Sequence, residues 1–171
     1  MVSVLIVLLK IYGYLNYEEL IELLYYYTDR DYNIDLLINS RLFKFNSVMK
    51  DNYYVYYEYL SYEKDLKNCM KENKLSLFKI DTNTLLGSKY QVINGDRNSV
   101  RKLNSIIQEN FGGNLEVLSL IRYYSLFDYK RKDLFKELVK YYKGNDFKKY
   151  KRLRDDLMNN FIAISLRGRA P

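Results

Sequence analysis

The sequence predicts a mainly helical α+β fold with small β hairpins, and three observations lead to this expectation. In several stretches, apolar residues recur every three or four positions, as they do along the buried side of a helix. Elsewhere, runs rich in Tyr, Val and Phe flank a short polar turn, which is the pattern of a hairpin. The chain has 171 residues and is 48% hydrophobic, which suffices for one domain or two small ones.

Two helices are expected at the start of the chain. Residues 2–12 are almost wholly apolar, which predicts a buried helix that stops at Gly13. Asn16 and Glu19 have the spacing of a capping box, in which each residue bonds the backbone of the other. We therefore expect a second helix over residues 17–27.

The turn expected over residues 28–33 is rich in oxygen-bearing side chains. Four such side chains stand at alternate positions and imitate the first half of a calcium loop: Asp29, Asp31, Asn33 and Asp35. The pattern then fails, because Ile34 stands where that loop needs Gly and Ser40 where it needs a bidentate Glu. We expect these side chains to serve turns and helix caps, and we expect no metal site.

A short helix over residues 34–41 is followed by two β-rich runs, residues 42–48 and 53–60, around a polar turn at 49–52. Three helices and a hairpin in this order resemble the winged helix-turn-helix superfamily over residues 2–60. The resemblance implies that the third helix is the recognition helix and that the polar turn is the tip of the wing.

The charge of this segment departs from the resemblance. Residues 1–60 hold 5 basic and 8 acidic side chains, whereas a winged helix that reads DNA usually presents a basic helix and a basic wing. The segment therefore either contacts DNA through Arg41, Lys44 and Lys50 or holds a dimer interface.

The middle of the chain predicts a connector and a second hairpin. Residues 61–74 indicate a polar helix or a linker. The β-rich runs 75–80 and 89–93 flank a polar stretch, which predicts a hairpin with a long loop. A helix is then expected through Asn110, capped by Asp96 or Ser99.

The last part of the chain predicts three further helices. Residues 111–114 contain two glycines and break the preceding helix, and the next helix is expected over 115–129. A short amphipathic helix over 134–143 and a longer one over 147–164 read as a helical hairpin, because a Gly-containing turn joins them.

These elements divide the chain into a winged-helix-like module (1–62), a connector with a hairpin (63–95) and a helical basic region (96–165). The final stretch, LRGRAP (166–171), concentrates residue types that are rare elsewhere in the chain. It looks like a translated cloning site, so we leave it out of the fold prediction.

Positive charge is concentrated near the end of the chain. Residues 121–171 hold 14 basic and 6 acidic side chains, although the net charge of the whole chain is only +7. A phosphate backbone needs such a row of cations, and a solvated helix face is the alternative reading. The candidate phosphate contacts are Lys130, Arg131, Lys132, Lys148, Lys149, Lys151, Arg152 and Arg154. Five tyrosines are interleaved with these cations: Tyr123, Tyr124, Tyr129, Tyr141 and Tyr142. Their rings suit stacking on bases, and packing in the core is the alternative role.

The composition argues against most catalytic chemistry. The absence of His removes His general bases and imidazole metal ligands, and one cysteine, Cys69, provides neither a disulfide nor a zinc or iron–sulfur site. No GxGxxG motif and no Walker lysine are present. We expect no enzyme activity, no catalytic residues, no cofactor and no metal.

Compartment and source follow from the same counts. No run reaches the roughly 18 apolar residues of a membrane span, and a lone cysteine fits a reducing cytoplasm. Tyr occurs 20 times and Asn 16 times, whereas Ala occurs twice, which indicates an AT-rich genome such as that of a virus or a mobile element.

The function expected from these observations is non-enzymatic nucleic-acid binding by a transcriptional or replication regulator. DNA is the expected ligand in preference to RNA, the module provides for a homodimer, and no membrane is involved. If the source is a virus, the compartment is the cytoplasm of the host cell.

The alternative is a protein-interaction module that binds a host factor, with the basic face against an acidic partner and tyrosines as hot spots. Asn110-Phe111-Gly112-Gly113 before an apolar helix resembles the Asn-Trp-Gly-Arg signature of Bcl-2-like proteins. Asn110 and Gly112 match, Phe111 replaces Trp, and Gly113 lacks the arginine that holds the partner. That resemblance implies an all-helical bundle, against which the two predicted hairpins argue.

Overall fold

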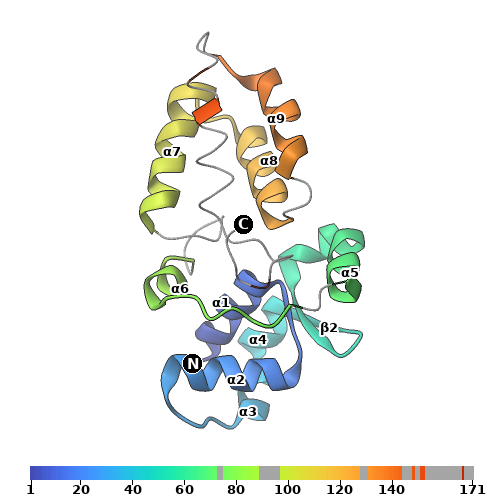
Figure 1. Cartoon of the computed structure of the whole chain (residues 1–171). Helices are drawn as coiled ribbons and strands as arrows, with labels where there is room; N and C mark the ends of the chain where they lie inside the picture. Colours follow the sequence, from blue (N-terminus) through green and yellow to red (C-terminus); the bar gives the residue numbers. More distant parts are fainter. Residues whose placement is uncertain are drawn as a thin grey trace.

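The computed structural model describes residues 1–72, 75–88, 97–127 and 131–143, together with Lys148, Lys151, Arg152 and Arg167. Figure 1 shows a helical protein with one small sheet. The first part of the chain forms α1 (Val2–Tyr12), β1 (Tyr14–Leu15), α2 (Tyr17–Thr28), α3 (Ile34–Ile38), α4 (Arg41–Asn46), β2 (Ser47–Lys50) and β3 (Tyr53–Tyr56). The 3-10 helix η1 (Tyr57–Tyr62) and five helices follow: α5 (Glu63–Glu72), α6 (Thr82–Ser88), α7 (Arg97–Phe111), α8 (Leu115–Leu126) and α9 (Arg131–Leu138). The 3-10 turn η3 (Val139–Tyr141) extends α9.

The three strands form an antiparallel sheet in the order β1-β3-β2. Val55 lies between Tyr14 of β1 and Val48 of β2, and its side chain is fully buried. The hairpin between β2 and β3 turns at Asp51 and Asn52, whose φ angles are +48° and +67°. Two successive positive φ angles are those of a type I′ turn, which matches the twist of the strands. The mainly helical α+β class is therefore confirmed, and the sheet departs from the all-helical bundle that the Bcl-2-like resemblance implies.

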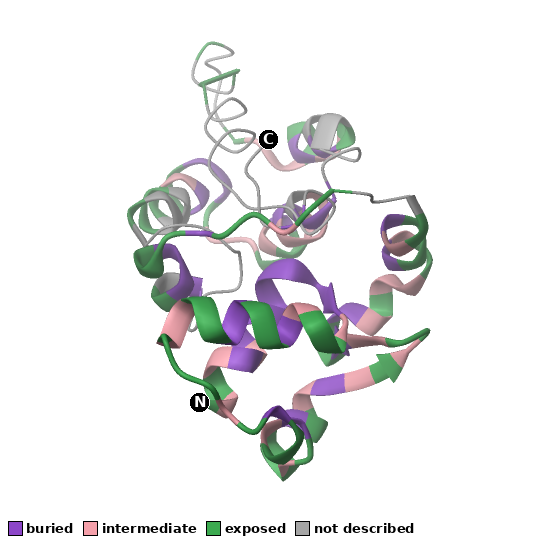
Figure 2. Cartoon of the chain, turned by 60° about the horizontal axis from the view of Figure 1, so that its bottom comes forward, coloured by how far each residue is buried: buried purple, intermediate pink, exposed green. Residues whose placement is uncertain are grey.

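The two helix boundaries predicted from caps are confirmed. α1 ends at Gly13, which has φ +79° and donates its N–H to the Leu9 carbonyl. The Asn16 side chain accepts from the Glu19 N–H, and the Glu19 carboxylate accepts from the Asn16 N–H, each at 2.9 Å. α1 lies in the middle of a hydrophobic core that includes residues of β1, α2 and η1, which we call the first core, and Figure 2 shows buried residues gathered on α1 and on the inner side of α2.

The prediction for residues 34–48 needs a correction. The third helix stops at Ile38 instead of residue 41, and residues 42–46 form helix α4 where a strand was expected. Ser40 explains the difference, because its hydroxyl accepts from the Phe43 N–H at 3.2 Å and starts a new helix. The second strand also ends early, at Tyr56, and η1 follows because Tyr59 turns into the core.

The second hairpin is a wrong prediction for the residues that the structure describes. Residues 75–81 form no strand, and the expected loop contains helix α6. Asp81 caps that helix by accepting from the Thr84 N–H at 2.9 Å and from the Thr84 hydroxyl at 2.5 Å. Residues 89–93, the other expected arm, lie outside the described residues.

Partly buried tyrosine hydroxyls take the place of strand pairing along residues 75–81. Tyr12 donates to the Phe78 carbonyl at 2.6 Å, and Tyr27 donates to the Ile80 carbonyl at 2.8 Å. Backbone carbonyls that leave water need such partners. This segment is thereby attached to the first core without forming a sheet.

The later helices follow the prediction with shifted ends. α7 ends at Phe111 before the two glycines, and the Asn114 side chain caps α8 by accepting from the Glu116 N–H at 2.8 Å. α8 ends at Leu126 rather than at residue 129, and α9 starts at Arg131 rather than at residue 134. Asp96 and most of the expected helix 147–164 lie outside the described residues.

Two hydrophobic cores are present in the part of the chain described. The first gathers α1, β1, α2 and η1, and the expected connector adds Leu66, Cys69, Ile80 and Leu85 to it. The second lies among α7, α8 and α9. At the junction, Arg122 forms an ion pair with Glu58, and the Tyr123 hydroxyl donates to Asp65 at 2.9 Å. The domain boundaries given above stay a prediction.

Arg167 is part of the fold, although the stretch that contains it was left out of the fold prediction. Only 4% of Arg167 is exposed. Its guanidinium forms an ion pair with Glu19, donates to the Tyr14 carbonyl at 3.3 Å and lies 4.8 Å from the centre of the Tyr14 ring. Its own carbonyl accepts from the Phe78 N–H at 3.0 Å. The cloning origin of residues 166–171 stays a prediction, but Arg167 joins the two ends of the chain.

Candidate functional site

The outer face of α4 brings together two of the predicted nucleic-acid contacts. Phe43 is the one buried side chain of this short helix, and successive residues are about 100° apart around the axis. Arg41 and Phe45 therefore point directly away from the core, with Lys44 and Leu42 to either side of them. We call these four exposed residues the α4 face: Arg41, Leu42, Lys44 and Phe45.

The buried side of α4 positions the α4 face through packing. The ring of Phe43 packs edge-on against Tyr54 of β3, with 5.5 Å between the ring centres, and α4 also contacts α1. Ser47 ends the helix, donates its hydroxyl to the Phe43 carbonyl at 2.9 Å and begins β2. The helix thus leads directly into the hairpin, and the burial of Phe43 sets which side of the helix faces outward.

The electrostatic character of the α4 face differs from that of the segment around it. α4 contains no acidic residue, and among the described residues neither Arg41 nor Lys44 forms an ion pair. The acidic side chains of residues 1–60 lie on α2, in the turn at 29–35, at Asp51 and at Glu58. Residues 1–60 carry a net charge of −3, from 5 basic and 8 acidic side chains, but this value does not describe the α4 face.

Lys50, the third predicted DNA contact of this segment, lies on β2 instead of α4 and forms an ion pair. Its Nζ lies 2.6 Å from the Glu63 carboxylate, which Lys67 also contacts at 2.9 Å. Hydrogen bonds from Lys50 and Lys67 lower the pKa of Glu63 to about 2. Lys50 therefore anchors the hairpin to α5, and the acidic Asp51 occupies the tip of the hairpin.

The eight candidate phosphate contacts between Lys130 and Arg154 form what we call the basic row, and the structure describes only part of it. Lys148, Lys151 and Arg152 are exposed, Arg131 and Lys132 lie in the first turn of α9, and Lys130, Lys149 and Arg154 lie outside the described residues. Two further cations on this stretch are paired locally, Lys136 with Asp133 at 3.0 Å and Lys140 with Glu137 at 2.6 Å. Such pairs reduce the charge that the row offers to phosphates.

The interleaved tyrosines serve the cores. Tyr124, Tyr141 and Tyr142 pack against the second core, and Tyr123 packs against the first. Their partly buried rings support packing over base stacking, and Tyr129 lies outside the described residues. The four-residue Asn110–Gly113 stretch is likewise structural: Asn110 and Phe111 end α7, where the Asn110 amide donates to the Ile106 carbonyl at 2.8 Å, and Gly112 and Gly113 form the turn after it.

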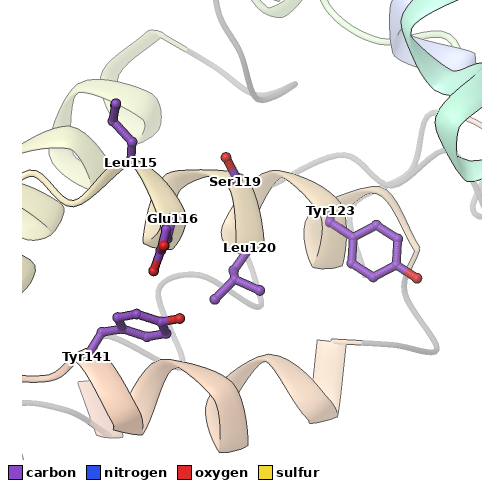
Figure 3. Close-up of a pocket in the computed structure, with 6 residues that line it drawn as sticks. All are labelled: Leu115, Glu116, Ser119, Leu120, Tyr123 and Tyr141. Atoms are coloured by element: carbon purple, nitrogen blue, oxygen red, sulfur yellow. The ribbon is translucent and has the colours of Figure 1, made fainter.

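A pocket of about 490 Å³ lies along α8 and faces η3. Figure 3 shows its lining: Leu115, Glu116, Ser119, Leu120, Tyr123 and Tyr141. A hydrogen bond to Glu116 raises the pKa of the Tyr141 hydroxyl, so the one lining carboxylate already has a partner. Sequence reasoning missed this pocket, because only tertiary packing places η3 beside α8.

The acidic turn has the structural roles expected of it. Asp29 ends α2 in the left-handed conformation, with φ +50°, and the Asn33 side chain caps α3. Asp35 accepts from the Tyr17 hydroxyl at 3.1 Å. Within the described ranges, no three His, Cys, Asp or Glu side chains are placed to hold a metal ion. No helix in those ranges is long and apolar enough to cross a membrane.

The fold and the α4 face define a mainly helical α+β protein with a small antiparallel sheet and an exposed face that is half cationic and half apolar. Comparisons with protein-family models, curated proteins and solved structures found no match to the chain.

Proposed function

We propose that this protein is a non-enzymatic nucleic-acid-binding protein whose N-terminal segment acts as a winged helix. An order of helices that leads directly into a two-stranded hairpin supports the resemblance. By that resemblance the recognition position belongs to α4, because α4 rather than the expected helix 34–41 joins the hairpin. DNA is the proposed ligand, and regulation in an AT-rich virus or mobile element is the proposed setting.

The observation that carries the proposal is the charge of the α4 face. Arg41 and Lys44 are exposed on one side of a short helix that has no carboxylate. Cations in such a position neutralise backbone phosphates and release condensed counterions, so they attract nucleic acid of any sequence. Lys148, Lys151 and Arg152 are a second exposed group for phosphate contact.

The test is binding of labelled DNA to the full chain, measured by fluorescence anisotropy between about 50 and 200 mM salt. We expect affinity to fall steeply with salt, and we expect the double variant Arg41→Glu, Lys44→Glu to lose at least about tenfold. The control is Arg30→Glu, Lys64→Glu, which changes the net charge equally at two exposed positions away from α4.

The outcomes separate the two groups of cations. Equal losses in the α4 variant and in the control would mean that net charge, not the α4 face, governs binding. Reversal of Lys148, Lys151 and Arg152 measures the share of the basic row. Absence of binding even at low salt would reject the nucleic-acid function.

A protein partner is the second candidate, because apolar side chains are exposed on and near α4. Leu36 of α3, which precedes α4, is 71% exposed, and Met49 of β2, which follows it, is 54% exposed. Exposed apolar groups of this kind mark protein contacts in many proteins. Binding of a partner through them would be insensitive to salt, which distinguishes it from binding to phosphates.

A further inference from the structure

We propose that the α4 face binds unpaired bases, so that single-stranded DNA is preferred to intact duplex. This inference rests on the proposed function and names the substrate class of the same site. It starts from the apolar half of the α4 face, which contact with phosphates does not explain.

Phe45 is the most exposed large apolar side chain in the described part of the chain, at 79%. It stands one helical turn after Arg41 on the outermost line of α4, and Leu42 beside it is 52% exposed. An uncovered aromatic ring loses favourable burial, and Phe43 of the same helix is only 1% exposed. The helix therefore places one ring inward for stability and one outward.

The pairing of a ring with cations matches the chemistry of a single strand. Arg41 and Lys44 suit phosphates, and the Phe45 ring suits the face of a base, which is apolar in every base. Leu42 widens the apolar surface on which the base and sugar lie. The α4 face presents no carboxylate that would repel the strand.

An intact duplex does not offer the same contact. Its base faces are stacked on one another, and only base edges reach the grooves. A Phe ring has no donor or acceptor with which to read those edges, and its one apolar target there is the thymine methyl group. The Phe45 ring therefore makes a larger apolar contact with an unpaired base than with an intact duplex.

The experiment measures binding of the full-length protein to labelled oligothymidylate and to a duplex of equal length at one salt concentration. We expect the single strand to bind at least about tenfold more tightly, and Phe45→Ala to remove most of that preference. The salt dependence should stay unchanged in Phe45→Ala, because no cation is lost, and Phe45→Tyr should keep the preference because it keeps the ring.

The matched control is Leu36→Ala, which removes an exposed apolar side chain from α3 instead of α4. It should leave both affinities unchanged. Circular dichroism checks that each variant remains folded, which is expected because both side chains are exposed. A single strand containing 2-aminopurine reports stacking directly, through a fluorescence change that Phe45→Ala should abolish.

Three outcomes overturn the inference alone, and a fourth overturns the proposed function together with it. If Phe45→Ala binds the single strand like wild type while Arg41→Glu, Lys44→Glu loses affinity, the nucleic-acid function stands and base stacking is rejected. Equal wild-type affinity for single strand and duplex rejects the preference. If light scattering shows self-association that Phe45→Ala abolishes, with DNA binding unchanged, the α4 face is a contact between copies of the chain. If wild type binds neither ligand, the proposed function itself fails.

Discussion

At the scale of single residues, Lys10 is unusual for a lysine because it is buried in the first core. It belongs to the otherwise apolar helix α1, is only 9% exposed and donates to the Ser88 carbonyl at 2.6 Å. Burial lowers its pKa to about 8, although nearby Glu58 raises it. The lysine therefore fastens α6 to α1 at an electrostatic cost.

This cost predicts an unusual rise of stability with pH. In the unfolded chain Lys10 keeps its ordinary pKa of 10.5, so between pH 8 and 10.5 the unfolded state binds more protons than the folded state. We expect the free energy of unfolding to increase by about 1–2 kcal/mol from about pH 7.5 to 9.5, as measured by urea denaturation. Ionisation of tyrosines, whose pKa values burial raises in Tyr12 and Tyr27, opposes the trend only above about pH 10.

The Lys10→Met variant isolates this effect, because it keeps the length of the side chain and removes the charge. Its stability should show no such rise over the same pH range. Lys64→Met, at an exposed position, should retain the wild-type profile. A wild-type profile that is flat or falling over this range would contradict the assignment to Lys10.

At the scale of elements, the residues that end and begin helices decided where sequence patterns failed. Residues 42–46 have the composition of a strand, but the Ser40 hydroxyl starts α4 and Phe43 then faces the core. Asp81 and Thr84 likewise start α6 within an expected loop. In both segments a local cap and tertiary burial outweighed β propensity, which is a weak preference.

The type I′ turn of the hairpin leads to a prediction for Asn52. Its φ of +67° is accessible to Asn and Gly but strained for a β-branched residue. We expect Asn52→Val to lower the free energy of unfolding by about 1–2 kcal/mol and Asn52→Gly to leave it nearly unchanged. Thermal and urea unfolding of both variants provide the measurement.

The control for this turn is the same change at an ordinary backbone conformation. Asn39 is exposed and has φ −80°, so Asn39→Val should cost less than Asn52→Val. Equal costs at the two positions would show that side-chain chemistry, and not backbone strain at the turn, sets the effect.

At the scale of the whole molecule, Arg167 links the two ends of the chain. Its side chain is 5% exposed and its partner Glu19 also belongs to the capping box of α2. Removing one member of a buried ion pair leaves the other charge without compensation. We expect Arg167→Met to lower the free energy of unfolding by about 3 kcal/mol, as measured by urea denaturation.

A double-mutant cycle separates this ion pair from simple packing. Arg167→Met combined with Glu19→Gln should recover part of the loss, because no uncompensated carboxylate then remains. Arg30→Met, at an exposed position, should have little effect. If Arg167→Met leaves stability unchanged, residues 166–171 are a dispensable addition, as their composition suggests.

The candidate site was predictable in its charges but not in its arrangement. Arg41 and Lys44 were identified from the sequence, whereas the sequence did not indicate that Lys50 pairs with Glu63 on α5. Phe45 was placed in a strand, so its position one turn after Arg41 was not foreseen. Which side chains are neighbours on a helix depends on where that helix begins. Here the cap at Ser40 determines where α4 begins.

The class of fold, the first two helices and the helix break at the two glycines were all predictable from the amino-acid pattern, because caps, glycines and apolar spacing are local signals. Three features emerged from the folded chain instead: residues 75–81 attach through tyrosine hydroxyls, Arg167 is buried, and α4 presents a cationic and aromatic face. Those features depend on which residues distant in sequence exclude water together, and no local pattern records that.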